Sequence, residues 1–235
     1  MEAALSAVPI VALDVQDISA ALAIVDTLGE SCRFYKVGSE LFTACGPSVV
    51  RELRAREADV FLDLKLHDIP NTVGGGVRGA ASLGARIVTI HAAGGEAMIR
   101  AAAQAARDAG NCAVFAVTLL TSLDASDVAR IWGRGEPVEI EDEVVRLAGL
   151  AKAGGAAGVV CSGREAGAVK ARYGVSLQLL IPGIRLAGGA THDQSRTASP
   201  AEAVAAGADY VVVGRAVTAA PDRVAAMREI LSQLR

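Results

Sequence analysis

The sequence predicts an α/β protein built as a (β/α)₈ barrel, with residues 1–235 forming a single domain. Eight short apolar runs rich in valine and isoleucine alternate with eight helical stretches, which is typical of βαβ units around a parallel sheet. The runs are apolar throughout rather than alternating with polar residues, as expected of strands covered on both faces. Eight such units in 235 residues fit the usual size of a closed barrel.

An open, doubly wound α/β sheet is the alternative architecture. Such a sheet usually carries a glycine-rich fingerprint directly after its first strand, whereas D-V-Q-D stands there in this chain, at residues 14–17. The three glycines at 74–76 follow the third strand instead and lack the G-x-G-x-x-G spacing. The barrel is therefore the favoured fold.

The first half of the chain supplies four pairs of strand and helix. We expect the strands at residues 9–15, 34–37, 60–65 and 87–91. The helices that follow them are expected at 18–28, 48–56, 71–83 and 96–109. Asp17 and Ser19 are residue types that favour a helix start, and they lie at the beginning of the first helix.

The second half supplies the other four pairs. Its strands are expected at 112–119, 158–161, 177–181 and 210–213, and its helices at 141–153, 164–173, 200–206 and 222–234. Pro200 suits the first position of a helix. Residues 121–137 show no clear period and contain the only tryptophan, so we expect a long loop with a short helix there.

Composition excludes several classes of protein. Hydrophobic residues make up 52% and charged residues 21% of the chain, which excludes intrinsic disorder. No apolar run is long enough to cross a membrane, and a net charge of −3 gives no indication of nucleic-acid binding. Because the N-terminus lacks the positive start of a secretory signal, we expect a cytoplasmic protein. The four scattered cysteines should be reduced, without a disulfide or a zinc site.

Charged residues lie within or directly after several apolar strands. Only four of the 23 basic residues are lysines, yet Lys36 and Lys65 both fall in expected strands. Asp63 and Lys65 are two residues apart and should share one face of their strand, and Asp68 follows just past the strand end. A lysine ammonium can donate a proton, which a guanidinium does not readily do. Alternating charges at the rim of a barrel therefore indicate proton chemistry.

Two structural alternatives remain for these charged residues. They could form an ion-pair ring that only stabilises the barrel mouth, although ion pairs buried for stability alone roughly break even. Asp14, at the end of the first strand, could simply cap the helix that follows it.

Glycines and arginines after the last two strands indicate a phosphate site. P-G-I-R at residues 182–185 ends the seventh strand, and V-G-R at 213–215 ends the eighth. Barrels often bind phosphate at the loops after these two strands. Glycine lets the backbone approach the anion, and arginine adds charge-assisted hydrogen bonds. Turn glycines and surface arginines without a ligand are the structural alternative.

The three histidines do not predict a metal site. We expect His91, which ends the fourth strand, to be a satisfied rim histidine, and His67 to aim away from the charged residues nearby. His192 should be solvated in the loop after the seventh strand. No two histidines have ligand spacing with a carboxylate.

The most specific motif is F-L-D-L-K-L-H-D-I-P-N-T at residues 61–72. Six further blocks lie at residues 11–14, 35–38, 120–122, 182–185, 193–196 and 213–215. Together these segments resemble the bacterial orotidine 5′-phosphate decarboxylase family, with 61–72 similar to the D-x-K-x-x-D signature of its superfamily and the other blocks in family order. The resemblance covers essentially the whole chain.

The resemblance implies decarboxylation of orotidine 5′-monophosphate to uridine 5′-monophosphate, the last step of de novo pyrimidine synthesis, without a cofactor or a metal. It implies that Lys65 protonates C6 of the pyrimidine, that Asp63 and Asp68 flank it, and that Lys36 completes the network. It also implies a homodimer, in which Asp68, Ile69 and Thr72 enter the neighbouring subunit's site. The remaining substrate contacts that it implies are Asp14 and Lys36 to the ribose, Thr121 and Ser122 to the pyrimidine, Gln194 between base and phosphate, and Arg185, Gly214 and Arg215 to the phosphate.

The residues are consistent with that chemistry. Loss of CO₂ leaves a carbanion, and there is no cofactor to accept its electrons. A preorganised ammonium at Lys65 would both stabilise the negative charge and deliver a proton, in a water-poor pocket where charge interactions are strong.

Two other functions stay open at this point. The 3-keto-L-gulonate 6-phosphate decarboxylases and hexulose-phosphate synthases also resemble D-x-K-x-x-D barrels but use Mg²⁺. They place a carboxylate at the end of the second strand, where this chain has Lys36, whose ammonium should repel the cation. A non-catalytic nucleotide-binding barrel would keep Arg185 and Arg215 but would have little reason to combine Lys36, Asp63 and Lys65.

Overall fold

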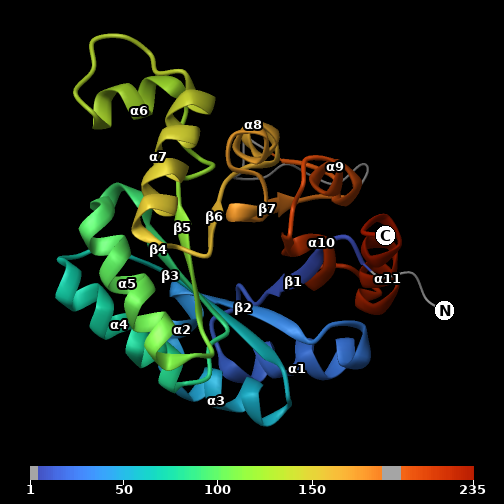
Figure 1. Ribbon diagram of the computed structural model, residues 1–235. Helices are drawn as coiled ribbons and strands as arrows, with labels where there is room; N and C mark the ends of the chain where they lie inside the picture. The colour runs from blue at the N-terminus through green and yellow to red at the C-terminus, as the bar shows by residue number, and fades with distance from the viewer. Residues whose placement is uncertain (1–4, 187–196) are drawn as a thin grey trace.

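Eight parallel strands form a closed barrel in the computed structural model, which describes residues 5–186 and 197–235 (Figure 1). Neighbours in the sequence are neighbours in the barrel, and β1 pairs with β8 to close the ring. This confirms the predicted (β/α)₈ fold class. The strands are β1 Val8–Ala12, β2 Phe34–Gly38, β3 Asp59–Leu66, β4 Ile87–His91, β5 Ala113–Val117, β6 Gly158–Val160, β7 Gln178–Ile184 and β8 Tyr210–Val213.

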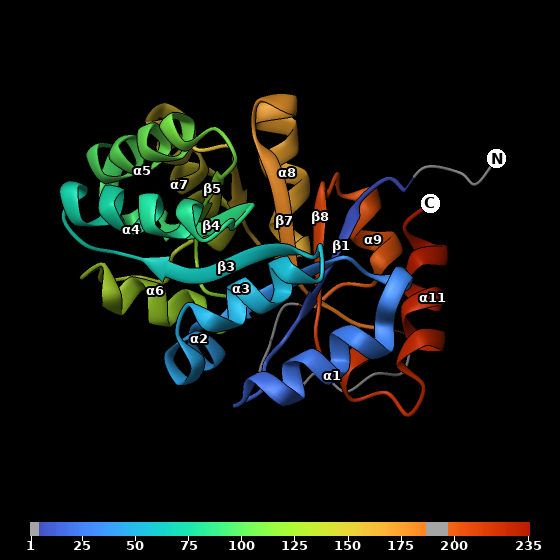
Figure 2. The ribbon, with the colours of Figure 1, turned by 90° about the horizontal axis from the view of Figure 1, so that it is seen from below.

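Among the described residues, seven longer helices connect successive strands and an eighth follows β8, and all pack against the outside of the barrel (Figure 2). Each of their bounds lies within about one residue of the position expected from the sequence, the usual uncertainty of a helix end. These helices are α1 Ile18–Leu28, α3 Ser48–Ala55, α4 Pro70–Ser82, α5 Gly95–Ala109, α7 Ile140–Gly154, α8 Gly163–Tyr173, α9 Pro200–Ala205 and α11 Arg223–Gln233.

Short elements complete the fold. The sequence predicted α6 Ala125–Ile131, inside the long loop, but not α2 Ser39–Cys45 or α10 Arg215–Thr218. Helices of one or two turns leave little periodicity to detect. Three 3₁₀ turns are η1 Gly29–Ser31, η2 Ala92–Gly94 and η3 Gly174–Ser176.

Helix caps explain several of these boundaries. The Asp17 carboxylate accepts a hydrogen bond from the backbone N–H of Ala20 at 2.8 Å and begins α1. Ser199 caps α9 together with Glu202, and Pro200 fills the first helical position. Because Asp17 is the cap of α1, the alternative in which Asp14 only caps that helix is excluded.

The barrel interior holds its own apolar layer, separate from the larger core between strands and helices. Side chains alternate along a strand, so the next inward positions after Phe34 and Phe61 are Lys36 and Asp63. The interior is packed below these charged residues, and the charges therefore lie at the carboxyl end of the barrel. The buried interior residues are Ile10, Ala12, Phe34, Phe61, Ile87, Phe115, Leu180 and Val212.

Some strand ends differ from the expectation. β1 ends at Ala12 rather than at residue 15, so Asp14 lies in the loop after the strand. β5 is shorter than the expected 112–119, whereas β7 continues to Ile184 instead of stopping at 181. Apolar residues of a buried loop look like strand residues in the sequence, which explains why β1 and β5 were predicted too long.

Two further expectations concern covalent and membrane features. All four cysteines lie within the described residues, and none of them forms a disulfide there. Burial raises the pKa of Cys32 and raises that of Cys112 to about 11, so these thiols stay protonated near neutral pH. In the described part of the chain, none of the helices has the length and apolar character needed to cross a membrane.

Candidate active site

A cavity of about 520 Å³ opens at the carboxyl ends of the strands. Its apolar floor includes Phe61, Leu180 and Val212 from the interior layer. Chemistry in this fold takes place at this end of the barrel. The cavity brings together eight residues that the sequence singled out, namely Asp14, Lys36, Asp63, Lys65, Thr121, Arg185, Gly214 and Arg215.

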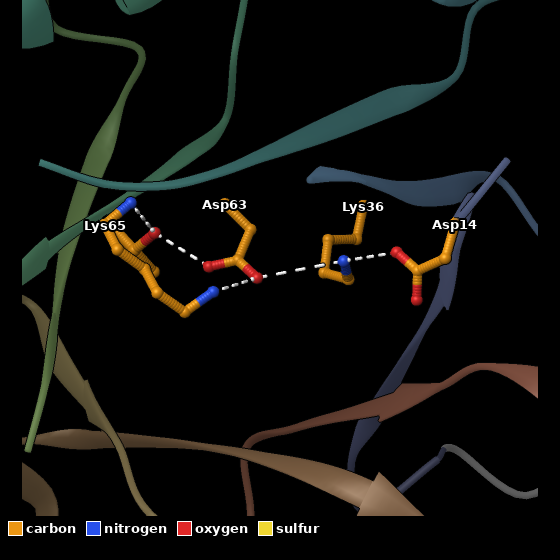
Figure 3. A network of polar contacts seen from close by, with 5 residues as sticks. Asp14, Lys36, Asp63 and Lys65 are labelled. Atoms are coloured by element: carbon orange, nitrogen blue, oxygen red, sulfur yellow. Dashed lines mark hydrogen bonds and ion pairs between the residues drawn. The ribbon is translucent and has the colours of Figure 1, made fainter. Parts of the chain in front are cut away.

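Four charged side chains form a row across the cavity, alternating in sign (Figure 3). The Lys65 ammonium donates to Oδ2 of Asp63 at 2.7 Å, and the Lys36 ammonium lies 3.8 Å from the same oxygen. Lys36 also donates to Oδ1 of Asp14 at 2.8 Å. The predicted alternation is therefore present, but its fourth member within one chain is Asp14 rather than Asp68.

A local irregularity of β3 aims Lys65 at Asp63. Between the pairs Leu62↔Val88 and Leu66↔Ile90, three residues of β3 lie opposite a single residue of β4. Lys65 has φ 50° in this bulge, a left-handed conformation that is uncommon for residues other than glycine. The sequence correctly predicted that Asp63 and Lys65 meet, but a regular strand is not the reason.

The single residue of β4 opposite the bulge is Thr89, which is fully buried. Its hydroxyl donates to Oδ1 of Asp63 at 2.9 Å and accepts the backbone N–H of Lys65 at 3.0 Å. The sequence analysis missed this residue. A signal for it was available, because Thr89 is a polar residue in the middle of the apolar run 87–91.

Electrostatics keep the central carboxylate ionised. Burial raises the pKa of Asp63, but the positive charges of Lys65 and Lys36 and the hydrogen bonds from Lys65 and Thr89 together bring this pKa below its ordinary value. The Asp63 side chain is 13% exposed and that of Lys65 is 34% exposed. The site thus holds an ammonium that can reach a ligand, fixed by a carboxylate that stays charged.

The predicted phosphate residues also line the cavity. Pro182, Gly183 and Arg185 come from the end of β7, while Gly214 and Arg215 follow β8. Thr121 lines the cavity from the loop after β5. Gln194 and His192 lie outside the described residues.

Four predicted residues stay outside the cavity of their own chain. Asp68, Ile69 and Thr72 are exposed on the segment that leads from β3 into α4, and Ile69 is 67% exposed. Asp68 accepts the backbone N–H of Ile69 at 2.6 Å. Ser122 is also exposed and is not among the residues that line the cavity, so its contact with the pyrimidine stays a prediction. The chain turns away from the cavity after Thr121.

Two polar residues that line the cavity were not predicted. Glu40 enters from the start of α2 and Thr218 from α10. Both helices were missing from the sequence-based assignment, so their position at the cavity was missing as well.

The histidines behave partly as expected. His91 is half-buried at the rim, and its ring centroid lies 5.5 Å from that of His67, which is exposed. Burial, then the nearby His67 and Lys65, lower the pKa of His91 and favour the neutral ring. Among the described residues, none donates a hydrogen bond to the His91 ring. The expectation that its ring nitrogens have partners within the protein is therefore not confirmed. Over residues 5–186 and 197–235, no group of three or more His, Cys, Asp or Glu could hold a metal ion.

A second cavity of about 530 Å³ is lined by α7 and by the loop that leads into it from α6. Its buried carboxylate, Glu143, is already paired with Arg146 at 2.5 Å and with Arg134 at 3.5 Å. These ion pairs neutralise the only deeply buried charge there among the described residues, so we assign no chemistry to this cavity.

Comparison with known proteins identifies a consistent set of relatives. A family model described as Orotidine 5′-phosphate decarboxylase / HUMPS family matches residues 8–230. An orotidine 5′-phosphate decarboxylase of Halorhodospira halophila is 50% identical over 226 residues, which are 96% of this chain and 94% of that protein. One of Anaeromyxobacter dehalogenans is 49% identical, covering 95% of this chain and 96% of that protein. The crystal structure of orotidine 5′-phosphate decarboxylase from Lactobacillus acidophilus has a TM-score of 0.86 at 35% identity, covering 97% of this chain and 99% of that one.

Proposed function

Because this chain belongs to the orotidine 5′-phosphate decarboxylase / HUMPS family, we propose that it is a carboxy-lyase of pyrimidine biosynthesis. It converts orotidine 5′-monophosphate into uridine 5′-monophosphate and CO₂. The observation that carries this proposal is the Lys65 ammonium, held 2.7 Å from a buried carboxylate at the wall of the cavity.

The charged row supplies the proton that the reaction needs. The bond between C6 of the pyrimidine and the carboxylate carbon breaks, CO₂ leaves, and the electron pair stays on C6. Lys65 donates a proton to C6 and regains one from solvent. Asp63 fixes the ammonium in place and stays ionised, so the positive charge of Lys65 is preorganised where negative charge develops.

The two ends of the substrate have separate binding groups. Arg185, Gly214 and Arg215 bind the phosphate, which barrels of this type take up after their last two strands. Asp14 and Lys36 hold the ribose hydroxyls, and Thr121 contacts the pyrimidine. Gln194 bridges base and phosphate. Binding energy from the remote phosphate can then be used to hold the reacting carbon against Lys65.

We propose further that two copies of the chain complete each site. Asp68, Ile69 and Thr72 are exposed and do not line their own cavity, although their segment follows directly on β3, which carries Asp63 and Lys65. An exposed isoleucine beside an exposed carboxylate suits an interface between copies. Across a two-fold axis, the same segment of each chain enters the other chain's cavity, and Asp68 of the partner subunit completes the set around Lys65.

The Mg²⁺-dependent sugar-phosphate decarboxylases are the competing class. The Lys36 ammonium lies 2.8 Å from Asp14 and 3.8 Å from Asp63, between the two carboxylates that a cation would need. A divalent cation there would face a positive charge, so the geometry favours the reaction without a metal.

Ultraviolet absorbance of orotidine 5′-monophosphate mixed with the purified protein tests the proposal directly. We expect the substrate's absorbance to disappear at the same rate with and without EDTA. Loss of activity in EDTA would favour the Mg²⁺-dependent class. No change in absorbance, together with nucleotide binding measured by calorimetry, would leave a barrel that binds its ligand without reacting.

A further inference from the structure

Thr89 is the one residue of β4 that faces the bulge of β3. Asp63, Leu64 and Lys65 occupy the stretch of β3 that corresponds to Thr89 alone on β4. Regular backbone pairing is interrupted there, and the Thr89 side chain fills the gap. Its hydroxyl is both a donor and an acceptor, which a single buried group needs to satisfy two neighbours at once.

The two hydrogen bonds of Thr89 reach different parts of the site. One accepts the N–H of Lys65, whose backbone is in the left-handed region at φ 50°. Such a conformation persists only where the surroundings hold it. The other bond goes to Oδ1 of Asp63, which leaves Oδ2 to face both ammonium groups.

We propose that Thr89 is a positioning residue for the proton transfer, an inference that rests on the proposed function. Its hydroxyl connects two groups: the backbone N–H of Lys65 and the Asp63 carboxylate, which accepts a hydrogen bond from the Lys65 ammonium. Both ends of the lysine side chain are therefore fixed through one atom. Thr89 touches neither the cavity nor the reacting carbon, because it lies behind Asp63 and is fully buried.

Because Thr89 is buried, water cannot replace its hydroxyl if that group is removed. The Thr89 side chain has no access to water, so removal of its hydroxyl leaves a buried N–H and a buried carboxylate oxygen without a partner from this position. Both groups would shift to find new partners. A displacement of about 1 Å at the reacting groups can reduce a rate about 100-fold.

The test compares Thr89→Val, which has the same shape without the hydroxyl, with Thr89→Ser, which keeps the hydroxyl. We expect Thr89→Val to lower kcat about 100-fold with KM within about threefold of wild type, and Thr89→Ser to restore most of kcat. Decarboxylation by the wild-type protein is measured first; its absence would contradict the proposed function and not the role of Thr89.

Thr118→Val is the matched control. Thr118, just after β5, is 3% exposed and its hydroxyl donates to the backbone oxygen of Val160 at 2.8 Å, so it is also a buried, hydrogen-bonded threonine. The same carbonyl also accepts the backbone N–H of Thr118 and keeps a partner in the variant. We expect its kcat to stay within about threefold of wild type. An equal loss in both valine variants would overturn the proposal, because the effect would be general.

The pH dependence of kcat gives a second readout. The hydrogen bond from Thr89 favours the ionised form of Asp63, which faces the charged groups of Lys36 and Lys65, with Asp14 on the far side of Lys36 and the neutral ring of His91 nearby. Thr89→Val should therefore move the acid limb of the kcat profile to higher pH, whereas Thr118→Val and Thr89→Ser should not. If Thr89→Val does not fold, Thr89→Ala replaces it, since it removes the hydroxyl without adding a contact. Unchanged kcat and an unchanged acid limb in the folded variant would refute the role.

Discussion

Lys65 combines two uncommon features, a left-handed backbone and an ammonium against a buried carboxylate. Because the proposed proton comes from this ammonium, we expect Lys65→Ala to fold and to lose turnover by at least about 10²–10⁴-fold, the usual contribution of general acid catalysis. Lys65→Arg should be similarly inactive, since a guanidinium does not give up its proton.

The control for this prediction is Lys152→Ala, which removes an exposed lysine on α7. Thermal unfolding of both variants measures whether they fold, and the absorbance assay measures their turnover. Near-normal turnover in Lys65→Ala would end the assignment of Lys65 as proton donor.

Asp63 predicts how stability depends on pH. Its pKa in the folded protein is lower than in the unfolded chain, where it is about 3.9. The stabilisation from ionised Asp63 is therefore complete above about pH 4–5 and is lost as the pH falls through the folded-state pKa. Urea unfolding of wild type and Asp63→Asn from pH 7 to pH 3 measures this. We expect the difference between their free energies of unfolding to be constant above pH 5 and to shrink below pH 4. Parallel curves would contradict the prediction.

At the residue scale, chemistry was easier to predict from the sequence than geometry. Charged Lys36, Asp63 and Lys65 in apolar strands are conspicuous, because an unpaired buried charge is costly. Thr89 is a polar residue in an apolar run, but threonine is common in strands, so this signal alone does not reveal its role without the bulge that faces it. Nothing in the local sequence 59–66 reveals that bulge, which depends on the pairing of β3 with β4.

At the element scale, two glycines give opposite predictions. Gly167 lies exposed in the middle of α8, and a Cβ there would meet no atom within 4 Å. Gly167→Ala should raise the free energy of unfolding by about 0.5–1 kcal/mol, because alanine loses less backbone entropy on folding.

Gly158, at the start of β6, is the contrasting case. A Cβ there would overlap the backbone oxygen of Gln178 and the ring of Phe115 in the barrel interior. Gly158→Ala should therefore lower the free energy of unfolding by about 1–3 kcal/mol or more. Urea unfolding at neutral pH measures both variants, and an equal effect in both would contradict the packing argument.

Long elements were predicted more closely than short ones. The eight longer helices repeat an apolar face over several turns, and β4 and β8 match their expected bounds. The short helices α2 and α10 start directly after β2 and β8, and there the chain brings Glu40 and Thr218 to the cavity. The positions of Glu40 and Thr218 at the cavity depend on these short helices, and the sequence therefore did not predict them.

At the scale of the whole molecule, the proposed two-chain site predicts complementation between inactive variants. Lys65→Ala lacks the proton donor of its own cavity, and Asp68→Ala lacks the group given to the partner. When the two are mixed and allowed to exchange subunits, half of the dimers contain one chain of each kind. One of the two sites in such a dimer is wild type in both residues, so about a quarter of wild-type activity should return.

Activity of the mixture is compared with that of each variant alone and with a mixture of Lys65→Ala and a Lys65→Ala, Asp68→Ala double variant, which has no intact site. Sedimentation confirms the oligomeric state. If Asp68 acts within its own chain, mixing restores nothing.

Barrel closure was predicted from the count and spacing of the strands, since eight βα units leave few other arrangements. The pairing of β1 with β8 joins segments about 200 residues apart, and no local pattern encodes it. The exposure of residues 68–72 likewise follows from the barrel as a whole rather than from their own sequence.

Because the barrel is a closed ring, the chain could begin at another βα unit and still form the same strand pairs. The backbone N–H of Ser6 donates to the carbonyl of Leu234 at 2.7 Å, so the first strand and the last helix meet. Val175, in η3 at the amino end of β7, is 95% exposed and lies on the opposite face from the cavity. A circular permutant that starts in η3 and joins the old ends by a short linker keeps every strand pair of the barrel. In that permutant, β7 and β8, which lead to the proposed phosphate-binding residues, would be synthesised before the strands that carry the charged row. The strand pair that closes the barrel would then be β6 with β7 instead of β1 with β8.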